Sequence, residues 1–421
     1  MMACPADSSH LCECPDCGLF VRVAPLPRRA LARCPRCGAV LARHRANPET
    51  RTLALALTAL MLLGIAATSP FLALDAAGLV RESRLLSGPE VLAERGFSAL
   101  ALVVLATTVL VPLARLAALA VVLIGVRLHL LEGQWGGAQW WGRRLSRRVL
   151  VHLLAWVERL SPWAMVEVFL LGTFVAYTKL VDLAEVSLGP ALYALGALML
   201  ASAAADAACD REALWRTLVP AASLPVSGGK LIGCDVCGLV CDAPEGSACP
   251  RCGSRLRRRK PAPLARTVAL LLAAAILYLP ANILPVMTVV RFGQSGTHTI
   301  LSGVEELIAD DMWPLALLVF FASITVPVLK LVGLTGLVVV THRRSRRGLR
   351  ERTVLFRIVD AIGRWSMIDV FMVSILVAIV QLGAIATIFP GPGVVAFCGV
   401  VILTMLAAES FDPRLMWDDR A

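Results

Sequence analysis

Eight cysteines form two clusters whose spacing is typical of tetrahedral metal sites. Each cluster contains two Cys-x2-Cys pairs, separated by sixteen residues in the first cluster and by eleven in the second. Four thiolates suit Zn²⁺, and a glycine after each pair permits the tight turn that aims backbone N–H groups at sulfur. We expect two structural Zn²⁺ ions, although a rubredoxin-type iron centre uses the same donors. The predicted metal ligands are Cys14, Cys17, Cys34 and Cys37, and Cys234, Cys237, Cys249 and Cys252.

Two further cysteines lie near these ligands. Cys12 and Cys241 are close enough in sequence to compete for the metal, but we interpret them as spare thiols. Dense clusters with basic neighbours indicate metal sites on the reducing side of a membrane and not disulfides. The simplest role for each ribbon is structural: metal folds a segment too small to fold alone, and the ribbon caps its own membrane module.

The amino-acid composition is that of a membrane protein. Of the 421 residues, 58% are hydrophobic and 17% are charged, and the mean hydropathy is +0.75. Soluble domains average about 45–50% apolar and about 25% charged residues, and a compact soluble chain cannot hide so much apolar surface. The excess of 41 basic over 30 acidic residues fits basic cytoplasmic loops. The basic run 257–260 adjoins an apolar segment, so we expect lipid contact there and no nucleic acid partner.

Eight apolar segments are long enough to cross about 30 Å of hydrocarbon. The sequence therefore predicts an all-α polytopic membrane protein: eight transmembrane helices as two parallel four-helix repeats, each preceded by a cytoplasmic zinc ribbon. The predicted spans are 52–74, 97–126, 161–183, 188–208, 267–289, 312–340, 365–389 and 393–408.

The chain is an internal duplication. An offset of 215 residues aligns Cys-Pro-Arg-Cys-Gly at Cys34 with the same sequence at Cys249, and an offset of 202 aligns Trp163 with Trp365. Because each half has an even number of spans, both halves enter the membrane in the same direction. The expected domains are a first ribbon (1–50), a first module (51–210), a second ribbon with linker (211–262) and a second module (263–421).

Loop charges predict the orientation. Eight arginines precede the first span, whereas the two longest loops on the opposite side hold four arginines against eight Asp or Glu. The first 50 residues contain no apolar signal segment. The positive-inside rule therefore places both termini and both ribbons in the cytoplasm.

Ionisable residues within spans point to function, because burial in hydrocarbon is costly. Lys330 could pair with Asp369, and Arg115 with Glu167 at the matching positions of the first half. Five prolines also fall within the expected spans, each freeing a carbonyl one turn back and suggesting kinked helices around a pocket. The predicted intramembrane polar site comprises Lys330, Asp369, Arg115, Glu167, Lys179 and, between Pro280 and Pro285, Asn282.

Catalytic signatures are missing from the sequence. It contains no phosphate-binding glycine loop with its Lys-Ser/Thr, no HExxH, no haem-attachment motif and no nucleophile elbow. We therefore expect a protein that is not an enzyme.

Three sets of repeated motifs resemble the paraquat-inducible protein A family of Gram-negative inner-membrane proteins, which includes LetA. They are the two cysteine ribbons, the Leu-Ser-Gly at Leu86 and Leu301, and the Trp-x-Met-x-(Glu/Asp)-Val-Phe at Trp163 and Trp365. The resemblance covers essentially the whole chain. It implies an inner-membrane subunit that passes phospholipid to or from a periplasmic conduit of MCE-domain protein.

Two other functions are compatible with the residues alone. Lys330, Asp369 and the parallel repeat would also suit a proton- or ion-coupled small-solute transporter. The thiolate clusters would suit a redox- or metal-responsive membrane regulator.

Overall fold

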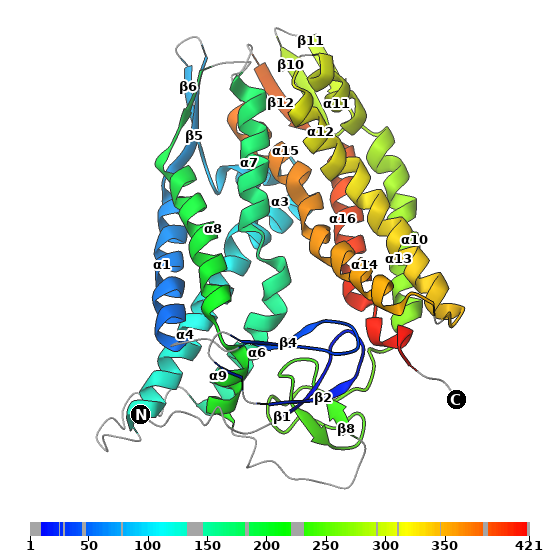
Figure 1. Ribbon diagram of the computed structural model, residues 1–421. Helices are drawn as coiled ribbons and strands as arrows, with labels where there is room; N and C mark the ends of the chain where they lie inside the picture. The colour runs from blue at the N-terminus through cyan, green and yellow to red at the C-terminus, as the bar shows by residue number, and fades with distance from the viewer. Residues whose placement is uncertain are drawn as a thin grey trace.

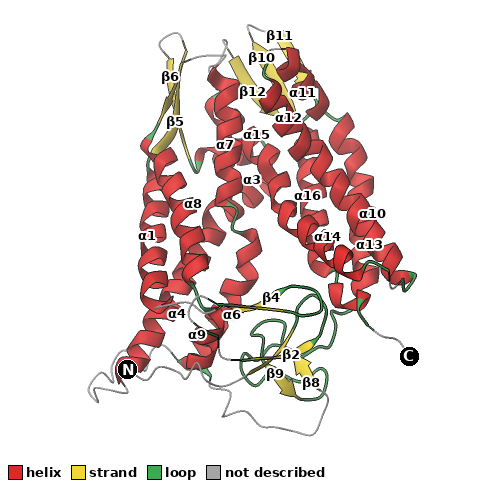
Figure 2. Cartoon of the chain, in the orientation of Figure 1, coloured by secondary structure: helices red, strands yellow, loops and turns green. Residues whose placement is uncertain are grey.

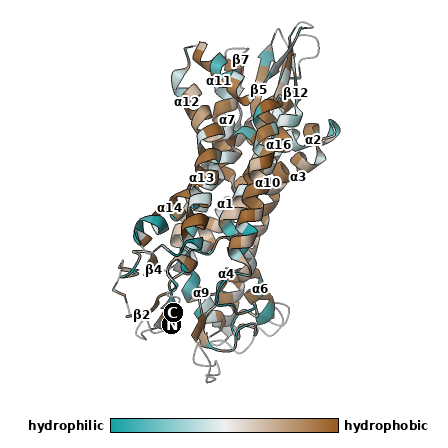
Figure 3. Cartoon of the chain, turned by 90° about the vertical axis from the view of Figure 1, so that its right-hand side faces the viewer, coloured by the Kyte–Doolittle hydropathy of each residue, from teal (hydrophilic) through white to brown (hydrophobic). Residues whose placement is uncertain are grey.

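A computed structural model confirms the predicted polytopic helical fold. It describes residues 10–24, 26–27, 30–43, 48–76, 79–132, 146–181, 185–219, 231–291, 294–309, 311–345, 347–381 and 386–418. Within these ranges, eight helical segments are long and apolar enough to cross a membrane. They lie side by side, with hydrophobic residues along their middles and more polar residues toward the two ends of the molecule (Figures 1 and 3).

The two modules repeat element by element. At the offsets read from the sequence, α1, α6 and α8 coincide in both bounds with α10, α14 and α16. The helices of the first module are α1 (Pro48–Thr68), α2 (Ser87–Glu94), α3 (Ser98–Leu105), α4 (Val111–Glu132), α6 (Arg147–Leu160), α7 (Val166–Val181), α8 (Pro190–Ala208) and α9 (Arg211–Leu218). Those of the second module are α10 (Pro263–Ile283), α11 (Ile300–Ala309), α12 (Trp313–Phe320), α13 (Val326–His342), α14 (Leu349–Ile362), α15 (Ile368–Ile379) and α16 (Pro392–Ser410).

Each module also carries a three-stranded antiparallel sheet at one end of the molecule, which we call the sheet end (Figure 2). The strand orders are β6-β5-β7 and β11-β10-β12, so the third strand comes from far along the chain. The strands are β5 (Pro70–Ala76), β6 (Leu79–Arg84) and β7 (Glu185–Leu188), and β10 (Met287–Arg291), β11 (Gln294–His298) and β12 (Ala386–Pro390).

These strands correct the predicted ends of four spans. Pro70 and Pro285 were expected within spans, but they follow the ends of α1 and α10. A residue before proline disfavours the α conformation, and Leu284 accordingly has an extended ψ of 148°. The apolar residues beyond each proline therefore continue as strands. The fourth and seventh spans are corrected too, because Leu188 belongs to β7 and the residues at 386–390 form β12 after α15 ends at Ile379.

Gly189 and Gly391 occupy equivalent positions where the third strand meets the turn after α1 or α10. A Cβ atom on Gly189 would lie 2.2 Å from the Pro70 oxygen, and one on Gly391 would lie 2.1 Å from the Pro285 oxygen. We expect Gly189→Ala and Gly391→Ala each to lower the free energy of unfolding by about 1–3 kcal/mol, because backbone must move. Thermal unfolding of the detergent-solubilised protein measures this effect. Gly196→Ala is the control, since its Cβ would contact nothing within 4 Å, and an equal loss there would contradict the steric explanation.

Two π-helical turns precede Pro112 and Pro327, two of the prolines that lie within spans. They are η1 (Ala106–Leu110) and η4 (Phe321–Thr325), and they stand at the same place in the repeat. Pro112 and Pro327 lack the N–H that would bond the carbonyl four residues back, so the helix widens there. At these turns the Thr108 and Ser323 hydroxyls each donate to a carbonyl four residues earlier, at 2.7 Å.

The two modules meet along α7 and α15. The rings of Phe169 and Phe371, which are equivalent in the repeat, pack edge to face with centroids 5.5 Å apart. A Cβ atom on Gly172 would lie 3.0 Å from the Phe371 Cβ, so glycine allows these two helices to approach closely. The contact between α7 and α15 is therefore formed by parts of the chain that the duplication made equivalent, and α2 also packs against α15.

The two ribbons lie together at the end opposite the sheets, which we call the ribbon end (Figure 1). The core of the first ribbon packs against Trp417 near the end of the second module. The second ribbon shares a buried cluster with α4, α6 and Trp215 of α9. The apolar core of each ribbon thus packs on the other module, which contradicts our expectation for the first ribbon. The second ribbon also contacts its own module, because Arg259 pairs with Asp418 and Lys260 donates to the Glu409 carbonyl, so the expectation holds there in part. The ribbon strands are β1 (His10–Glu13), β2 (Phe20–Val23), β3 (Leu31–Arg33) and β4 (Val40–Arg43), and β8 (Leu231–Gly233) and β9 (Val240–Asp242).

Candidate functional site

The eight predicted ligand cysteines form two compact groups. In each group the four Sγ atoms lie within 4.8 Å of one another, and all eight residues are buried. In the first, Cys14 and Cys37 are 3.5 Å apart and Cys17 and Cys34 are 3.6 Å apart. A tetrahedral metal with bonds of about 2.3 Å separates its sulfurs by about 3.8 Å, so the donor set fits such an ion. The second group, Cys234, Cys237, Cys249 and Cys252, has corresponding distances of 3.5 and 3.7 Å.

Tight turns explain why these thiols converge. Gly18 and Gly238 have φ angles of +67° and +68°, a region that favours glycine. Their N–H groups each donate to the carbonyl of the first cysteine of the pair, at 2.9 Å. Cys12 and Cys241 lie outside the two groups, because their thiols donate to the carbonyls of Val21 and Ile232. Burial raises the pKa of Cys12 to about 11, which favours the thiol over the thiolate that binds metal.

Arg414 joins the two ribbons to the second module. Its guanidinium lies 3.0 Å from Asp412 at the end of that module, 3.3 Å from Glu13 of the first ribbon and 3.0 Å from Asp235 of the second. Glu13 also accepts a hydrogen bond of 2.9 Å from the backbone N–H of Gly233. The Arg414 side chain is only 5% exposed, so these contacts form in a largely desolvated setting.

Burial and charge act in opposite directions on the two acids beside Arg414. Burial raises the pKa of Glu13, although Arg414 and the Gly233 N–H oppose the rise. Burial also works against ionisation of Asp412, but the hydrogen bonds from Arg414 outweigh it and lower the pKa of that carboxyl. Arg414 therefore keeps its closest partner ionised.

The first ribbon is anchored to the second module by additional contacts. Arg357 of α14 donates to Asp16 at 2.6 Å and lies 3.5 Å from the Cys37 sulfur. Trp417 donates to the Thr353 hydroxyl at 3.0 Å, and the Arg36 guanidinium stacks 4.7 Å from its ring centre. The ribbons therefore form a continuous connection between the modules at the ribbon end.

The intramembrane polar residues have different partners from those predicted. Lys330 donates to the Gly363 carbonyl and to the Thr404 hydroxyl, both at 3.0 Å, and does not bond Asp369. Both Asp369 carboxylate oxygens are buried without a hydrogen-bond partner among the described residues. The predicted Lys330–Asp369 pair is therefore wrong: the two side chains are buried, but Lys330 reaches α16 and the end of α14 instead.

In the first module the structure adds another partner to the predicted Arg115–Glu167 pair. Arg115 forms an ion pair with Asp206 of α8, and it shares a cavity with its expected partner Glu167. The side chain of Asn282 donates to the Tyr278 carbonyl at 2.8 Å. Pro280 leaves a different carbonyl, that of Ile276, without its helical hydrogen bond, and Asn282 does not satisfy it. Asn282 is thus a local helix contact.

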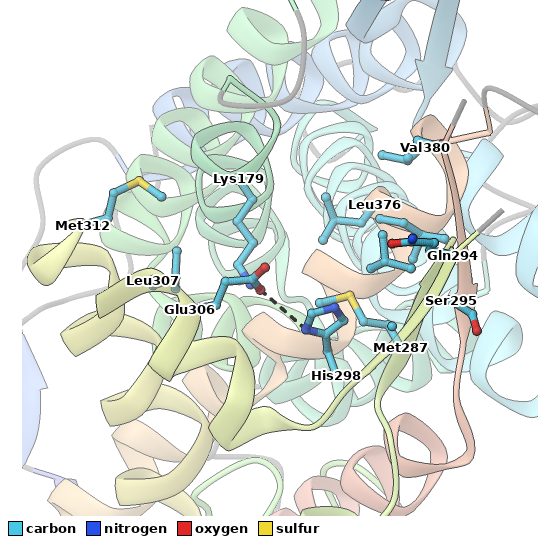
Figure 4. A pocket seen from close by; sticks show the side chains of 14 residues that line it. Lys179, Met287, Gln294, Ser295, His298, Glu306, Leu307, Met312, Leu376 and Val380 are labelled. Carbon is cyan, nitrogen blue, oxygen red and sulfur yellow. Dashed lines mark ion pairs between the residues drawn. The ribbon is translucent and has the colours of Figure 1, made fainter. Parts of the chain in front are cut away.

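Lys179 projects from α7 of the first module into a cavity of about 770 Å³ in the second module at the sheet end (Figure 4). His298 and Glu306 lie on the same wall, with the imidazole Nδ1 3.5 Å from the carboxylate. The apolar lining includes Met287, Leu307, Leu376, Val380 and Ile388. A pocket of this size with a few charged groups on an apolar wall suits an amphipathic ligand.

Sequence reasoning missed His298 and Glu306 because it read the polar segment after the fifth span as a simple loop. The repeated Leu-Ser-Gly at Leu301 was the available signal. Ser302 accepts a hydrogen bond from the Thr299 N–H at the start of α11, and a Cβ atom on Gly303 would lie 3.8 Å from the Lys179 Nζ. The motif therefore lies at the start of the helix that carries Glu306, and its glycine allows that helix to approach Lys179.

The family model for paraquat-inducible protein A matches residues 50–219 and 264–421, which include nearly all described helices of both modules. The chain belongs to the paraquat-inducible protein A family. The intermembrane transport protein PqiA of Escherichia coli K12 is 33% identical over 413 residues, covering 96% of this chain and 95% of that protein. The E. coli K12 lipophilic envelope-spanning tunnel protein A is 31% identical, covering 96% and 91%. A probable intermembrane transport protein of Haemophilus influenzae is 25% identical, covering 96% and 95%.

The comparison with solved structures found no significant match. The family match agrees with a multi-pass membrane protein. The matched segments omit residues 220–263, which contain the second ribbon, and begin after the first ribbon. The family model therefore does not cover the ribbons, and the ribbon contacts described above come from the structure of this chain alone.

Proposed function

We propose that this paraquat-inducible protein A family member is the inner-membrane subunit of a lipid transport system. It would pass phospholipid between the inner membrane and a periplasmic conduit built from MCE-domain protein. The observation that carries the proposal is the sheet-end cavity, whose charged wall and apolar wall match the two parts of a phospholipid. The printed names of its relatives, intermembrane transport protein and envelope-spanning tunnel protein, agree with such a role.

The orientation follows from the loop charges. Basic loops favour the cytoplasm, and the ribbon end carries the arginine-rich segments. The sheet end would then face the periplasm, where a conduit protein could contact the two sheets. We assign Zn²⁺ to both cysteine groups, because four thiolates at these separations suit this ion. The metals would hold the ribbons in shape, with no step of transport assigned to them.

Gentle purification of the tagged protein from native membranes, followed by mass spectrometry, tests the proposal. We expect an MCE-domain protein and enriched phospholipid to co-purify with the chain. A lone protein without specific lipid would contradict the proposal and favour a small-solute transporter. If deletion of the gene left envelope lipid composition unchanged, that result would also count against it.

Lys179 gives a sharper prediction for the same cavity. We expect Lys179→Met to reduce phospholipid transfer roughly tenfold, because a charge-assisted hydrogen bond to a lipid phosphate is lost. Transfer from vesicles to purified partner protein is the measurement. Arg84→Met, which removes an exposed charge from the sheet end outside the cavity, is the control. Equal transfer by wild type and Lys179→Met would rule out the cavity as the lipid site.

A further inference from the structure

The first module contains a second cavity, far along the molecule from the sheet end. Its volume is about 490 Å³, within the range of small-molecule sites. It lies between α4, the short helix η2 (Ser161–Trp163), α7 and α8. The polar part of its lining is formed by Arg115, Ser161, Glu167, Ser202 and Asp206.

Arg115 has an unused hydrogen-bond donor in this cavity. The residue is 5% exposed, and its Nη2 bonds Asp206 while its Nε has no partner among the described residues. Leaving a buried charged donor unpaired is costly. Its equivalent in the second module, Lys330, is instead satisfied by Gly363 and Thr404. The two equivalent cations thus have different partners, and Arg115 keeps an unpaired Nε beside a cavity of about 490 Å³.

The charges around the cavity distinguish between headgroups. Among the described residues of the lining, Arg115 is the one cation, whereas Glu167 and Asp206 supply two carboxylates. The nearby Glu158 is already ion-paired with Arg211. The lining therefore has a net charge of −1, which disfavours a purely anionic headgroup. A group that carries both a phosphate and an ammonium complements it better.

The cavity is also placed where a lipid headgroup can reach it. Leu200, in the lining, is 66% exposed on α8, a helix that is long and apolar enough to cross a membrane. The side chain of Asp206 is 40% exposed, and α8 ends two residues later at Ala208. The cavity therefore opens near the membrane boundary of the ribbon end, with Leu116, Leu198 and Met199 lining its apolar part.

We propose that this cavity binds the headgroup of a zwitterionic phospholipid with a primary ammonium, the phosphate on Arg115 and the ammonium on Glu167 and Asp206. The inference rests on the proposed lipid-transport function and adds a site in the leaflet at the ribbon end. The sheet-end cavity and this one would then serve opposite faces of the membrane. Arg115 would select for phosphate, and the two acids would select against headgroups without a cation.

Lipid retention by the purified full chain tests the site. The protein is equilibrated with vesicles containing equal amounts of phosphatidylethanolamine and phosphatidylglycerol, and bound lipid is counted by native mass spectrometry. We expect wild type to retain phosphatidylethanolamine preferentially. Glu167→Gln should lower that preference roughly tenfold, and Arg115→Gln should lower retention of both lipids. Arg127→Gln, on the same helix but outside the cavity lining, should bind as wild type does.

Two further measurements keep this inference separate from the proposed function. Ser202→Leu fills the cavity without removing a charge, so it should reduce retention even if Arg115→Gln fails to fold. Wild-type preference for phosphatidylglycerol, or an unchanged preference in Glu167→Gln, would overturn the site while leaving lipid transport intact. A wild-type protein that retains no phospholipid of either kind would contradict the site and the proposed function together.

Discussion

Replacing Cys34 and Cys37 with serine is expected to remove one metal ion per chain and to detach the first ribbon from the second module. Structural zinc contributes about 10–16 kcal/mol to the folding of small metal domains at pH 7, so the ribbon should unfold without it. Because Asp16 and Cys37 are the contacts of Arg357, the link to α14 should be lost as well. Metal content by plasma mass spectrometry should fall from two ions to one, and limited proteolysis should cut the released ribbon.

The paired control is Cys12→Ser with Cys241→Ser. These thiols bond backbone carbonyls and lie outside the cysteine groups, so both metals should remain. Two metals bound to the Cys34/Cys37 variant would show that other ligands complete the site. Loss of membrane insertion in the variant would show that the ribbon is needed before the helices assemble. Loss of a signalling output with insertion intact would favour the regulator hypothesis.

Arg414→Ala is expected to be the most damaging single substitution at the ribbon end outside the cysteines. It would leave Asp412 and Glu13 buried without their shared cation, and breaking such a buried network costs about 3–5 kcal/mol. It would also remove a side chain of the second module that contacts both ribbons. Thermal unfolding, together with disulfide trapping of cysteines introduced in the two ribbons, would report the loss of stability and of ribbon contact.

Arg216→Ala is the matched control for charge removal. Arg216 pairs with Glu212 one helical turn away, and both side chains are partly exposed. Such pairs contribute about 0.3–0.5 kcal/mol. If the thermal stability of Arg414→Ala equalled that of Arg216→Ala, the ion-pair network at Arg414 would not contribute to the stability of the fold.

The repeat in the sequence predicted much of the fold. The shared offsets located the equivalent helices and the two ribbons, and hydropathy counted the spans correctly. The sheets were missed because the residues after Pro70 and Pro285 are as apolar as the helices before them, and a hydropathy window cannot distinguish them. Their third strands come from more than ninety residues away, so no local pattern could reveal the pairing.

Side-chain partners were harder to predict than burial. Lys330 was correctly expected at depth, but its partner depends on how α13 is rotated against α16. Ordinary polar groups, the Thr404 hydroxyl and the Gly363 carbonyl, satisfy it there. Arg115 of α4 likewise pairs with Asp206 near the end of α8, because the packing of these two helices places the two side chains side by side. The crossing of the ribbons was unpredictable for the same reason, since sequence order alone favours the nearer module.

The crossed ribbons have a consequence for half-length versions of this protein. A chain with one ribbon and one module would leave the ribbon's docking surface, around the equivalent of Trp417 or Trp215, without its normal occupant. Two identical copies could exchange ribbons and satisfy both surfaces, which is the geometry of a domain-swapped dimer with two-fold symmetry. The present chain can be viewed as such a dimer whose subunits have been joined by the segment between α9 and the second ribbon.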